Sequence, residues 1–228
     1  MLFATKRARP DTGTAISFLM TRTKEPDRDD WSKLAHLMKY VRGTRKLPLI
    51  LGANGSGMLK WWIDGSYAVH PNMRGHTGGG LSMGIGFPVS ASKKQKLNTR
   101  SSTESEIVSV DDLMPAILWS RLFVEAQGYS TNESIIYQDN KAAMLLEKNG
   151  KASSGKRTKH INVRYFFVTD RIAKGEVKVE WCPTEDMTGD FWTKPLQGAQ
   201  FRRFRDVIIG AVPQLDPRSE KSKKKAKE

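Results

Sequence analysis

The stretch Lys60–Ala68, K-W-W-I-D-G-S-Y-A, decides the fold. Trp61, Trp62 and Ile63 are bulky residues that favour a pleated, half-buried strand. Asp64 follows them in the middle of this strand, where an acid is expensive to bury unless it is paired or binds a metal. A strand that simply ends in an Asp-Gly turn is the alternative interpretation. The rest of the chain decides between the two, because it supplies three further acids in comparable settings.

The composition predicts one domain of ordinary size with an appendage. The chain has 228 residues, of which 38% are hydrophobic, and six Trp, which is enough to build a core. Its formal net charge of +14 and sequence pI of 9.9 favour an anionic partner such as nucleic acid, with a solubility effect as the alternative. The single cysteine, Cys182, excludes an internal disulfide and a cysteine-cluster zinc site. It fits a reducing, intracellular compartment.

No apolar run reaches the roughly 18 residues that a membrane span needs, so we expect no membrane partner.

Residues 1–58 are predicted to be a helical appendage. Asp29 and Asp30 are candidate caps, and Gly43 is a candidate stop. Between them apolar residues recur at helical spacing, namely Trp31, Leu34, Leu37, Met38 and Val41. The basic flanks of this stripe suit either a packed helix with a solvated face or a helix along a phosphate backbone. The Gly-rich stretch 51–57 is typical of a linker or turn and marks the domain boundary.

Residues 59–95 are predicted to be an antiparallel set of three strands. We expect strands at 59–67, 81–85 and 87–92, with a turn at 84–86 and a polar loop from His70 to Thr77. Gly78–Gly80 is not a phosphate loop, because no Lys-Ser/Thr ending or helix follows it. A basic cluster comes after the third strand. It consists of Lys93, Lys94, Lys96 and Arg100.

A helix is predicted from Thr103 to about Gln127, with Ser and Thr caps and carboxylates in its first turn. Pro115 is expected to kink or split it. Val110-Asp111-Asp112 matches a reverse transcriptase polymerase motif in letters. That motif needs a hairpin between strands, whereas the periodicity here is helical, so the match is rejected.

Two more acids follow in the second half of the chain. Asp139 ends a short strand, 134–138, just before a helix, so a site at a sheet edge and an ordinary helix cap both fit it. Asp190 lies where Gly189–Trp192 opens a late helix. The remaining expected elements are a cationic loop at 148–159, a helix at 160–174, a strand at 176–181, a helix near 201–208 and a Lys-rich tail.

This order of elements predicts a mixed sheet with helices on its faces. Such a sheet can gather Asp64, Glu104 or Glu106, Asp139 and Asp190. Clustered carboxylates repel one another and need a compensating cation. Oxygen ligands alone suit Mg²⁺ or Mn²⁺ better than zinc. Two such ions about 4 Å apart support phosphodiester hydrolysis.

Five motifs, in order, resemble one family. They are W-W-I-D-G-S-Y-A (61–68), K-Q-K-L-N-T-R-S-S-T-E-S-E (94–106), Y-Q-D-N-K-A-A (137–143), K-H-I-N-V-R-Y-F-F (159–167) and G-D-F-W-T-K-P-L (189–196). Together they resemble the ribonuclease H domain of copia-type LTR retrotransposon Pol polyproteins, over about residues 59–200. Residues 26–44 are similar to the stretch that joins the reverse transcriptase to that domain. The chain thus looks like the C-terminal end of a Pol product.

The resemblance implies a ribonuclease H-like mixed five-stranded sheet at 59–212, a helical connection segment at 1–58 and a basic disordered tail at 213–228. It implies a metal-dependent enzyme that cuts the RNA strand of an RNA–DNA hybrid, with two Mg²⁺ ions and with Mn²⁺ as a possible substitute. The rest of the reverse transcriptase is the expected partner. The place of action is then intracellular, in a cytoplasmic virus-like particle or in the nucleus.

The family's Asp-Glu-Asp-Asp set maps onto Asp64, Glu106, Asp139 and Asp190. Glu106 is preferred to Glu104 because E-I-V-S-V (106–110) matches the pattern around the family's glutamate. Asp64 would bridge both ions, Glu106 and Asp139 would hold one, and Asp190 the other. The candidate nucleic-acid contacts are Lys93, Lys94, Lys96, Arg100, Lys156, Arg157, Lys159 and His160.

Three features depart from the family pattern or leave a role open. Gly189 stands where the family usually has Ala, and the loop 183–188 has no His. His160 is expected to be structural or substrate-facing rather than catalytic. Two rival functions remain open, a catalytically silent nucleic-acid-binding remnant of a Pol protein and a DNA-cutting transposase or integrase on the same fold.

Overall fold

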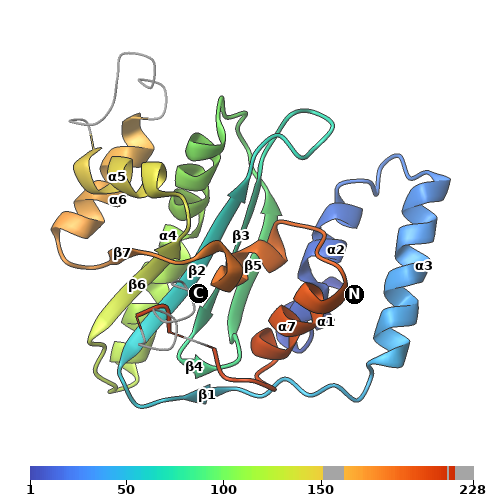
Figure 1. Ribbon diagram of the computed structural model, residues 1–228, viewed down its shortest axis with the longest axis horizontal. Helices are drawn as coiled ribbons and strands as arrows, with labels where there is room; N and C mark the ends of the chain where they lie inside the picture. Colours follow the sequence, from blue (N-terminus) through green and yellow to red (C-terminus); the bar gives the residue numbers. More distant parts are fainter. Residues whose placement is uncertain (151–161, 215, 219–228) are drawn as a thin grey trace.

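A mixed five-stranded sheet forms the centre of the protein (Figure 1). The computed structural model describes residues 1–150, 162–214 and 216–218. The strands lie in the order β5-β3-β2-β6-β7, with β2 in the middle. β3 runs antiparallel to β2 and β5, whereas β6 runs parallel to β2 and β7. The strand bounds are β2 Met58–Ser66, β3 His76–Ser82, β5 Val89–Lys94, β6 Glu133–Gln138 and β7 Lys178–Trp181. This is the mixed five-stranded sheet that the sequence predicts.

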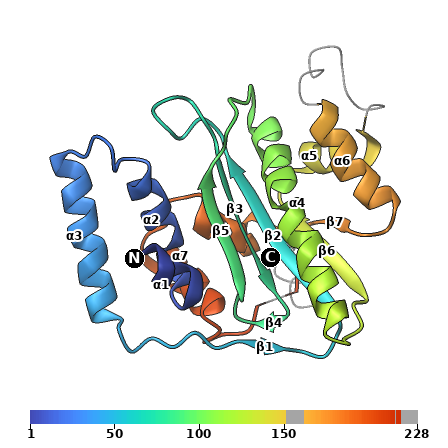
Figure 2. The same cartoon turned by 180° about the vertical axis from the view of Figure 1, so that it is seen from behind.

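Helices cover both faces of the sheet (Figures 1 and 2). α4, α5 and α6 lie on one side, and the N-terminal helices lie with α7 on the other. The helix bounds are α1 Leu2–Arg7, α2 Gly13–Met20, α3 Arg28–Gly43, α4 Ser102–Ala126, α5 Lys141–Asn149, α6 Asn162–Ala173 and α7 Gly198–Ile208. Short 3-10 turns lie at η1 Pro10–Thr12, η4 Thr184–Asp186 and η5 Thr188–Trp192. None of the helices in the described part of the chain is long and apolar enough to cross a membrane.

The middle strand is buried on both faces because its large residues alternate between two cores. Trp61 and Ile63 pack in the cluster formed with α4, whereas Trp62 packs with the aromatic residues of η5 and with α7. Since side chains alternate along a strand, Asp64 lies on the same face as Trp62, toward η5. The aromatic run that begins the deciding stretch therefore fixes the side of the sheet on which the acid lies.

The antiparallel strands differ from the sequence prediction at their ends. β3 begins at His76, inside the predicted polar loop, and includes Gly78–Gly80. A Cβ at Gly78 would lie 2.5 Å from Thr193 Cγ2, and one at Gly80 would lie 2.6 Å from Trp192 Cη2. Gly78 and Gly80 are therefore strand residues on which the end of η5 packs directly, although composition alone assigns them to a loop.

Two short strands replace the predicted turn and part of the predicted linker. Gly84–Ile85 forms β4, which pairs with β1, Gly52–Ala53. The strand that follows, β5, begins at Val89 and not at Phe87. The predicted stretch 51–57 thus contributes backbone hydrogen bonds to a small second sheet.

The helix α4 is continuous through Pro115, so the proline does not split it, and the alternative expectation of a kink stays a prediction. Val110, Met114 and Ile117, before and after the proline, are all fully buried. Tertiary packing of this apolar face compensates the hydrogen bond that a proline removes from a helix.

The helix predicted in the appendage is present as α3 and ends at Gly43, but Asp27 rather than Asp29 or Asp30 is its cap. Asp27 Oδ1 accepts from the Asp30 backbone nitrogen at 2.8 Å, and Asp30 Oδ2 accepts from the Asp27 backbone nitrogen at 3.1 Å.

Residues before α3 contact the turn η5. Trp192 Nε1 donates to the Pro10 carbonyl at 3.3 Å, and the Thr14 hydroxyl donates to the Phe191 carbonyl. The boundary at residue 58 stays a prediction.

The first residues of the predicted tail lie against the sheet. Asp216 Oδ2 is 2.7 Å from Lys60 Nζ, and Asp216 Oδ1 accepts from the Tyr137 hydroxyl at 2.8 Å. Arg218 Nη1 lies 2.9 Å from Glu133 Oε2. These contacts hold residues 216–218 beside β2 and β6, whereas residues 219–228 lie outside the described part.

Candidate metal centre

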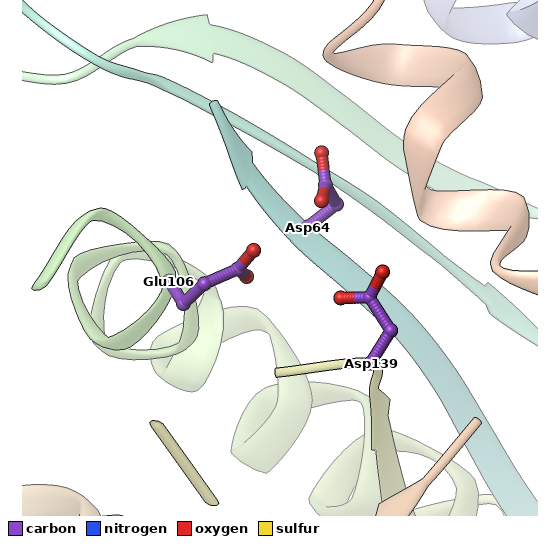
Figure 3. Close-up of side chains that lie close together, drawn as sticks. All are labelled: Asp64, Glu106 and Asp139. Carbon is purple, nitrogen blue, oxygen red and sulfur yellow. The ribbon is translucent and has the colours of Figure 1, made fainter. Parts of the chain in front are cut away.

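Three carboxylates from distant parts of the chain meet at one edge of the sheet (Figure 3). Asp64 comes from β2, Glu106 from the first turns of α4, and Asp139 directly follows β6. One carboxylate oxygen of each lies within 4.8 Å of those of the other two. Asp64 and Glu106 are buried, and Asp139 is half-buried. These three residues are among the four acids predicted from the sequence.

Strand register brings Asp64 and Asp139 together. Trp62 pairs with Tyr137 in the parallel β2–β6 ladder. Asp64 and Asp139 each lie two residues beyond that pair, so their side chains leave the sheet on the same face, side by side. Asp139 therefore lies at the sheet edge beside Asp64 and also directly before helix α5.

Close contact between α4 and β2 places Glu106 beside these two acids. A Cβ at Gly65 would lie 2.5 Å from the Ser105 carbonyl oxygen, so only glycine permits the approach. Ser105 Oγ donates to the Ser66 carbonyl at 3.1 Å, and Gln95 Nε2 donates to the Ser105 carbonyl at 2.9 Å. Gln95, which was not predicted from the sequence, lies directly after β5, and its buried amide connects that strand to the helix.

The alternative glutamate, Glu104, has a different task. Its Oε2 accepts from the Arg100 backbone nitrogen at 2.6 Å, and its own backbone nitrogen donates to Ser101 Oγ at 3.2 Å. Both bonds belong to the N-terminal cap of α4. Glu106 rather than Glu104 therefore lies in the carboxylate cluster.

The environment of Glu106 favours a cation. Burial, and then the charges of Asp64 and Asp139, raise the pKa of Glu106 well above its ordinary value. Within the described residues, the buried Glu106 Oε2 has no hydrogen-bond partner. A buried carboxylate oxygen without a partner is costly, and a metal ion removes that cost. Oxygen donors alone fit a hard divalent ion such as Mg²⁺.

The fourth acid, Asp190, lies on η5 and is 3% exposed. It is outside the three-carboxylate cluster and beside Asp64. Lys194 Nζ is 2.7 Å from Asp190 Oδ1 and 3.5 Å from Asp64 Oδ1. Burial and then Asp64 raise the pKa of Asp190 to about 7, and the Lys194 ammonium opposes this rise. The structure thus brings all four predicted acids to one region, divided into two parts.

Two neighbours of Asp190 fix Asp64. The Thr193 hydroxyl donates to Asp64 Oδ2. A Cβ at Gly189 would lie 3.1 Å from the Asp64 backbone nitrogen, so the turn packs tightly on β2 here. Glycine at 189, the departure from the family pattern, suits this close approach. Thr193 and Lys194 belong to the motif G-D-F-W-T-K-P-L, but no role was predicted for either from the sequence.

The site opens into a surface hollow of about 480 Å³. Three of the acids, Asp64, Glu106 and Asp139, line it together with Asn140 and Lys194. A hollow lined by carboxylates and one ammonium is suited to a polyanionic substrate only when cations neutralise its acids.

The predicted nucleic-acid contacts are only partly described. Lys93 lies on β5 and donates to the Asp112 carbonyl at 2.9 Å. Lys94 is half-buried at the end of β5, and Lys96 and Arg100 are exposed. The other four residues, Lys156, Arg157, Lys159 and His160, lie outside the described residues. Their role in binding stays a prediction.

Comparisons with known proteins concern the chain as a whole. No family model matches the sequence. Over 208 residues the chain is 31% identical to the retrovirus-related Pol polyprotein from transposon RE2 of Arabidopsis thaliana, covering 90% of the chain. Over 209 residues it is 26% identical to that from transposon TNT 1-94 of Nicotiana tabacum, covering 91% of the chain. The chain spans only 14% and 16% of the lengths of these polyproteins.

Among solved structures, LC11-RNase H1, isolated from compost, covers 60% of this chain and 92% of its own, with 10% identity and a TM-score of 0.44. The sequence relatives confirm the resemblance that the five motifs indicated. This chain is similar over most of its length to one part of the retrovirus-related Pol polyproteins of these transposons, and it has the mixed five-stranded sheet that the resemblance implied.

Proposed function

We propose that the chain is a metal-dependent nuclease of the ribonuclease H type, which hydrolyses the RNA strand of RNA–DNA hybrids. The observation that carries the proposal is the convergence of Asp64, Glu106 and Asp139, with a buried and unpartnered oxygen on Glu106 among the described residues. Three carboxylates so close together repel one another, and a buried carboxylate oxygen that only stabilised the fold would have a donor. The kinship with retrotransposon Pol polyproteins makes a hybrid the natural substrate.

The proposed cofactor is a pair of Mg²⁺ ions, with Mn²⁺ as a substitute. Asp64, Glu106 and Asp139 would hold one ion, and Asp64 with Asp190 the other. Such a pair orients the attacking water and stabilises charge on the leaving oxygen at a phosphodiester.

The residues of the chain contribute orientation and binding. The Thr193 hydroxyl and the packing of Gly189 fix the rotamer of Asp64, so that its carboxylate need not reorganise when substrate arrives. Positive charge outside the hollow would hold the phosphate backbone, and contacts to 2′-hydroxyls would select RNA. Lys96 and Arg100, both exposed after β5, are the described candidates for the backbone contact.

The test is cleavage of an end-labelled RNA–DNA hybrid by the purified chain in Mg²⁺. Asp64→Asn and Asp139→Asn should lower the cleavage rate by at least about 100-fold while hybrid binding stays within a few-fold, since each change removes a carboxylate charge but keeps the side-chain volume. Glu106→Gln should behave in the same way. The matched control is Glu104→Gln, which makes the same chemical change two residues earlier on the same helix and should retain cleavage.

Each rival function predicts a different result. Salt-dependent binding of the hybrid without metal-dependent cleavage would identify a silent binding remnant. Cleavage of duplex DNA in place of the hybrid would identify a DNA-cutting enzyme. Normal cleavage by both aspartate variants would show that the carboxylate cluster is not the active site.

A further inference from the structure

Lys194 lies where a cation is needed between two of the four acids. We propose that its ammonium is an internal counter-ion that neutralises Asp64 and Asp190 until a second divalent ion displaces it. The two metal positions are then unequal, and the position on Asp190 fills last. This inference rests on the proposed function, because it concerns the same metal centre.

The distances support this assignment. Lys194 Nζ is 2.7 Å from Asp190 Oδ1 and 3.5 Å from Asp64 Oδ1. The two carboxylate side chains are 5% and 3% exposed, whereas the Lys194 side chain is 41% exposed. The lysine thus reaches from solvent onto two buried acids. A long flexible side chain in this position can move back to water without disturbing the packing around it.

The backbone of Lys194 is anchored independently of its ammonium. Its backbone nitrogen donates to the Asp190 carbonyl at 2.9 Å. Thr193, the residue before it, holds Asp64 through its hydroxyl. The turn therefore keeps its position when the lysine side chain moves, and only the charge between the two acids changes.

The other half of the centre has a different electrostatic character. No lysine or arginine of the described residues forms an ion pair with Glu106 or Asp139. A divalent ion that enters among Asp64, Glu106 and Asp139 relieves their mutual repulsion and meets the ammonium only through its longer, 3.5 Å contact to Asp64. An ion that binds at Asp190 must also break two contacts to an ammonium. The centre therefore has one position where a metal ion binds with little interference from the ammonium, and one where the ion must displace it.

A purely structural role for Lys194 is the alternative, in which the ion pair only fastens η5 to β2. Removal of the charge would then weaken folding and leave metal affinity unchanged or lower. The competition role predicts the opposite for the second ion, because its affinity should rise when the ammonium is gone.

The experiment is a calorimetric titration of the full chain with Mn²⁺, together with counting of free Mn²⁺ by electron paramagnetic resonance. The wild-type protein should bind one ion and then a second at least about tenfold more weakly. Lys194→Met keeps the apolar stem and removes the charge, so it should tighten the second site about tenfold and leave the first within about twofold. Lys194→Arg keeps the charge and should retain the weak second site.

The matched control is Lys174→Met. Lys174 also pairs with an aspartate four residues earlier, at 2.9 Å from Asp170, but at the end of α6 and away from the centre. This variant should bind both ions as the wild type does. Thermal unfolding in EDTA gives a second readout, since Lys194→Met should lower the midpoint and Mn²⁺ should restore it.

The outcomes separate the two proposals. An enzyme that cuts hybrids but whose Lys194→Met variant binds the second ion no more tightly than wild type overturns the inference alone. A chain that shows the unequal sites and their response to Lys194→Met but cuts no hybrid overturns the proposed function alone. Loss of all Mn²⁺ binding in Asp64→Asn confirms that the titration reports this centre.

Discussion

Glu147 offers a quantitative test of how the interior beside the metal centre is built. It lies on α5 and is fully buried. The Gln138 amide lies 2.7 and 3.2 Å from the two carboxyl oxygens of Glu147 and hydrogen-bonds to this group. Burial raises the pKa of Glu147 from 4.5 to about 8, while the Gln138 amide and Lys148 oppose the rise. At neutral pH this side chain is therefore held in its protonated form.

The direction of the pH effect follows from proton binding. The folded protein holds the Glu147 proton more tightly than the unfolded chain does. The stabilisation is fully present below pH 4.5 and is lost as the pH rises through about 8. With 1.36 kcal/mol per pKa unit, the loss between pH 4.5 and pH 7 is about 3 kcal/mol. Because the group is fully buried, solvent screening does not reduce this figure.

Glu147→Gln keeps the size and hydrogen-bonding capacity of the side chain and removes its titration. We expect the unfolding free energy of the variant, relative to wild type, to rise by about 3 kcal/mol from pH 4.5 to pH 7. Urea denaturation in EDTA at several pH values measures it. Glu185→Gln, on an exposed residue, is the control and should show no such trend. A difference between Glu147→Gln and wild type that does not change with pH would refute the buried, protonated state.

Other predictions concern the opposite face, the helix contact and the substrate. Burial lowers the pKa of His76 to about 3, so on acidification the unfolded chain binds this proton before the folded protein does. The free energy of unfolding should therefore fall by about 2 kcal/mol from pH 6.5 to pH 5. Urea titrations of His76→Gln should show that this pH-dependent loss is gone. Gly65→Ala places a Cβ 2.5 Å from the Ser105 carbonyl and should destabilise the protein by about 1–3 kcal/mol in the same assay, with unchanged stability as the contrary result. Lys96→Gln and Arg100→Gln should each reduce the salt dependence of hybrid binding by about one phosphate contact in fluorescence anisotropy, and an unaltered slope would exclude that residue from the interface.

Features of the fold that depend on apolar side chains could be predicted from the sequence. Trp61, Trp62 and Ile63 determined the middle strand, and the acid after them was correctly placed beside Asp139. Features that depend on the absence of a side chain could not be predicted from the sequence. Gly78–Gly80 resembles a loop in composition, yet it lies within β3, and Trp192 occupies the space where side chains of Gly78 and Gly80 would lie. Contacts of that kind are decided by a partner more than 100 residues away.

Pro115 shows that a locally unfavourable residue can also be outweighed by distant contacts. Proline disfavours a helix interior locally, by about 3 kcal/mol. The helix nevertheless continues, since Met114 and Ile117 are fully buried in the core shared with β2. Burial of two such side chains contributes a similar or larger free energy, about 1.5–3 kcal/mol each. The split, one of the two outcomes expected from the local rule, therefore does not occur, because tertiary burial outweighs the local cost.

The net charge of the candidate metal centre suggests a reason for the four clustered acids. Four carboxylates, Asp64, Glu106, Asp139 and Asp190, share one region with the ammonium of Lys194. If all ionise, four negative charges and one positive charge leave a net charge of −3. Apolar residues of similar volume would be a more stable filling for such a buried site. A single lysine is too small a charge to balance this cluster, and the raised pKa values of Glu106 and Asp190 express the remaining deficit. Under the proposed function divalent ions would fill that deficit, and one of them would compete with Lys194 for Asp190.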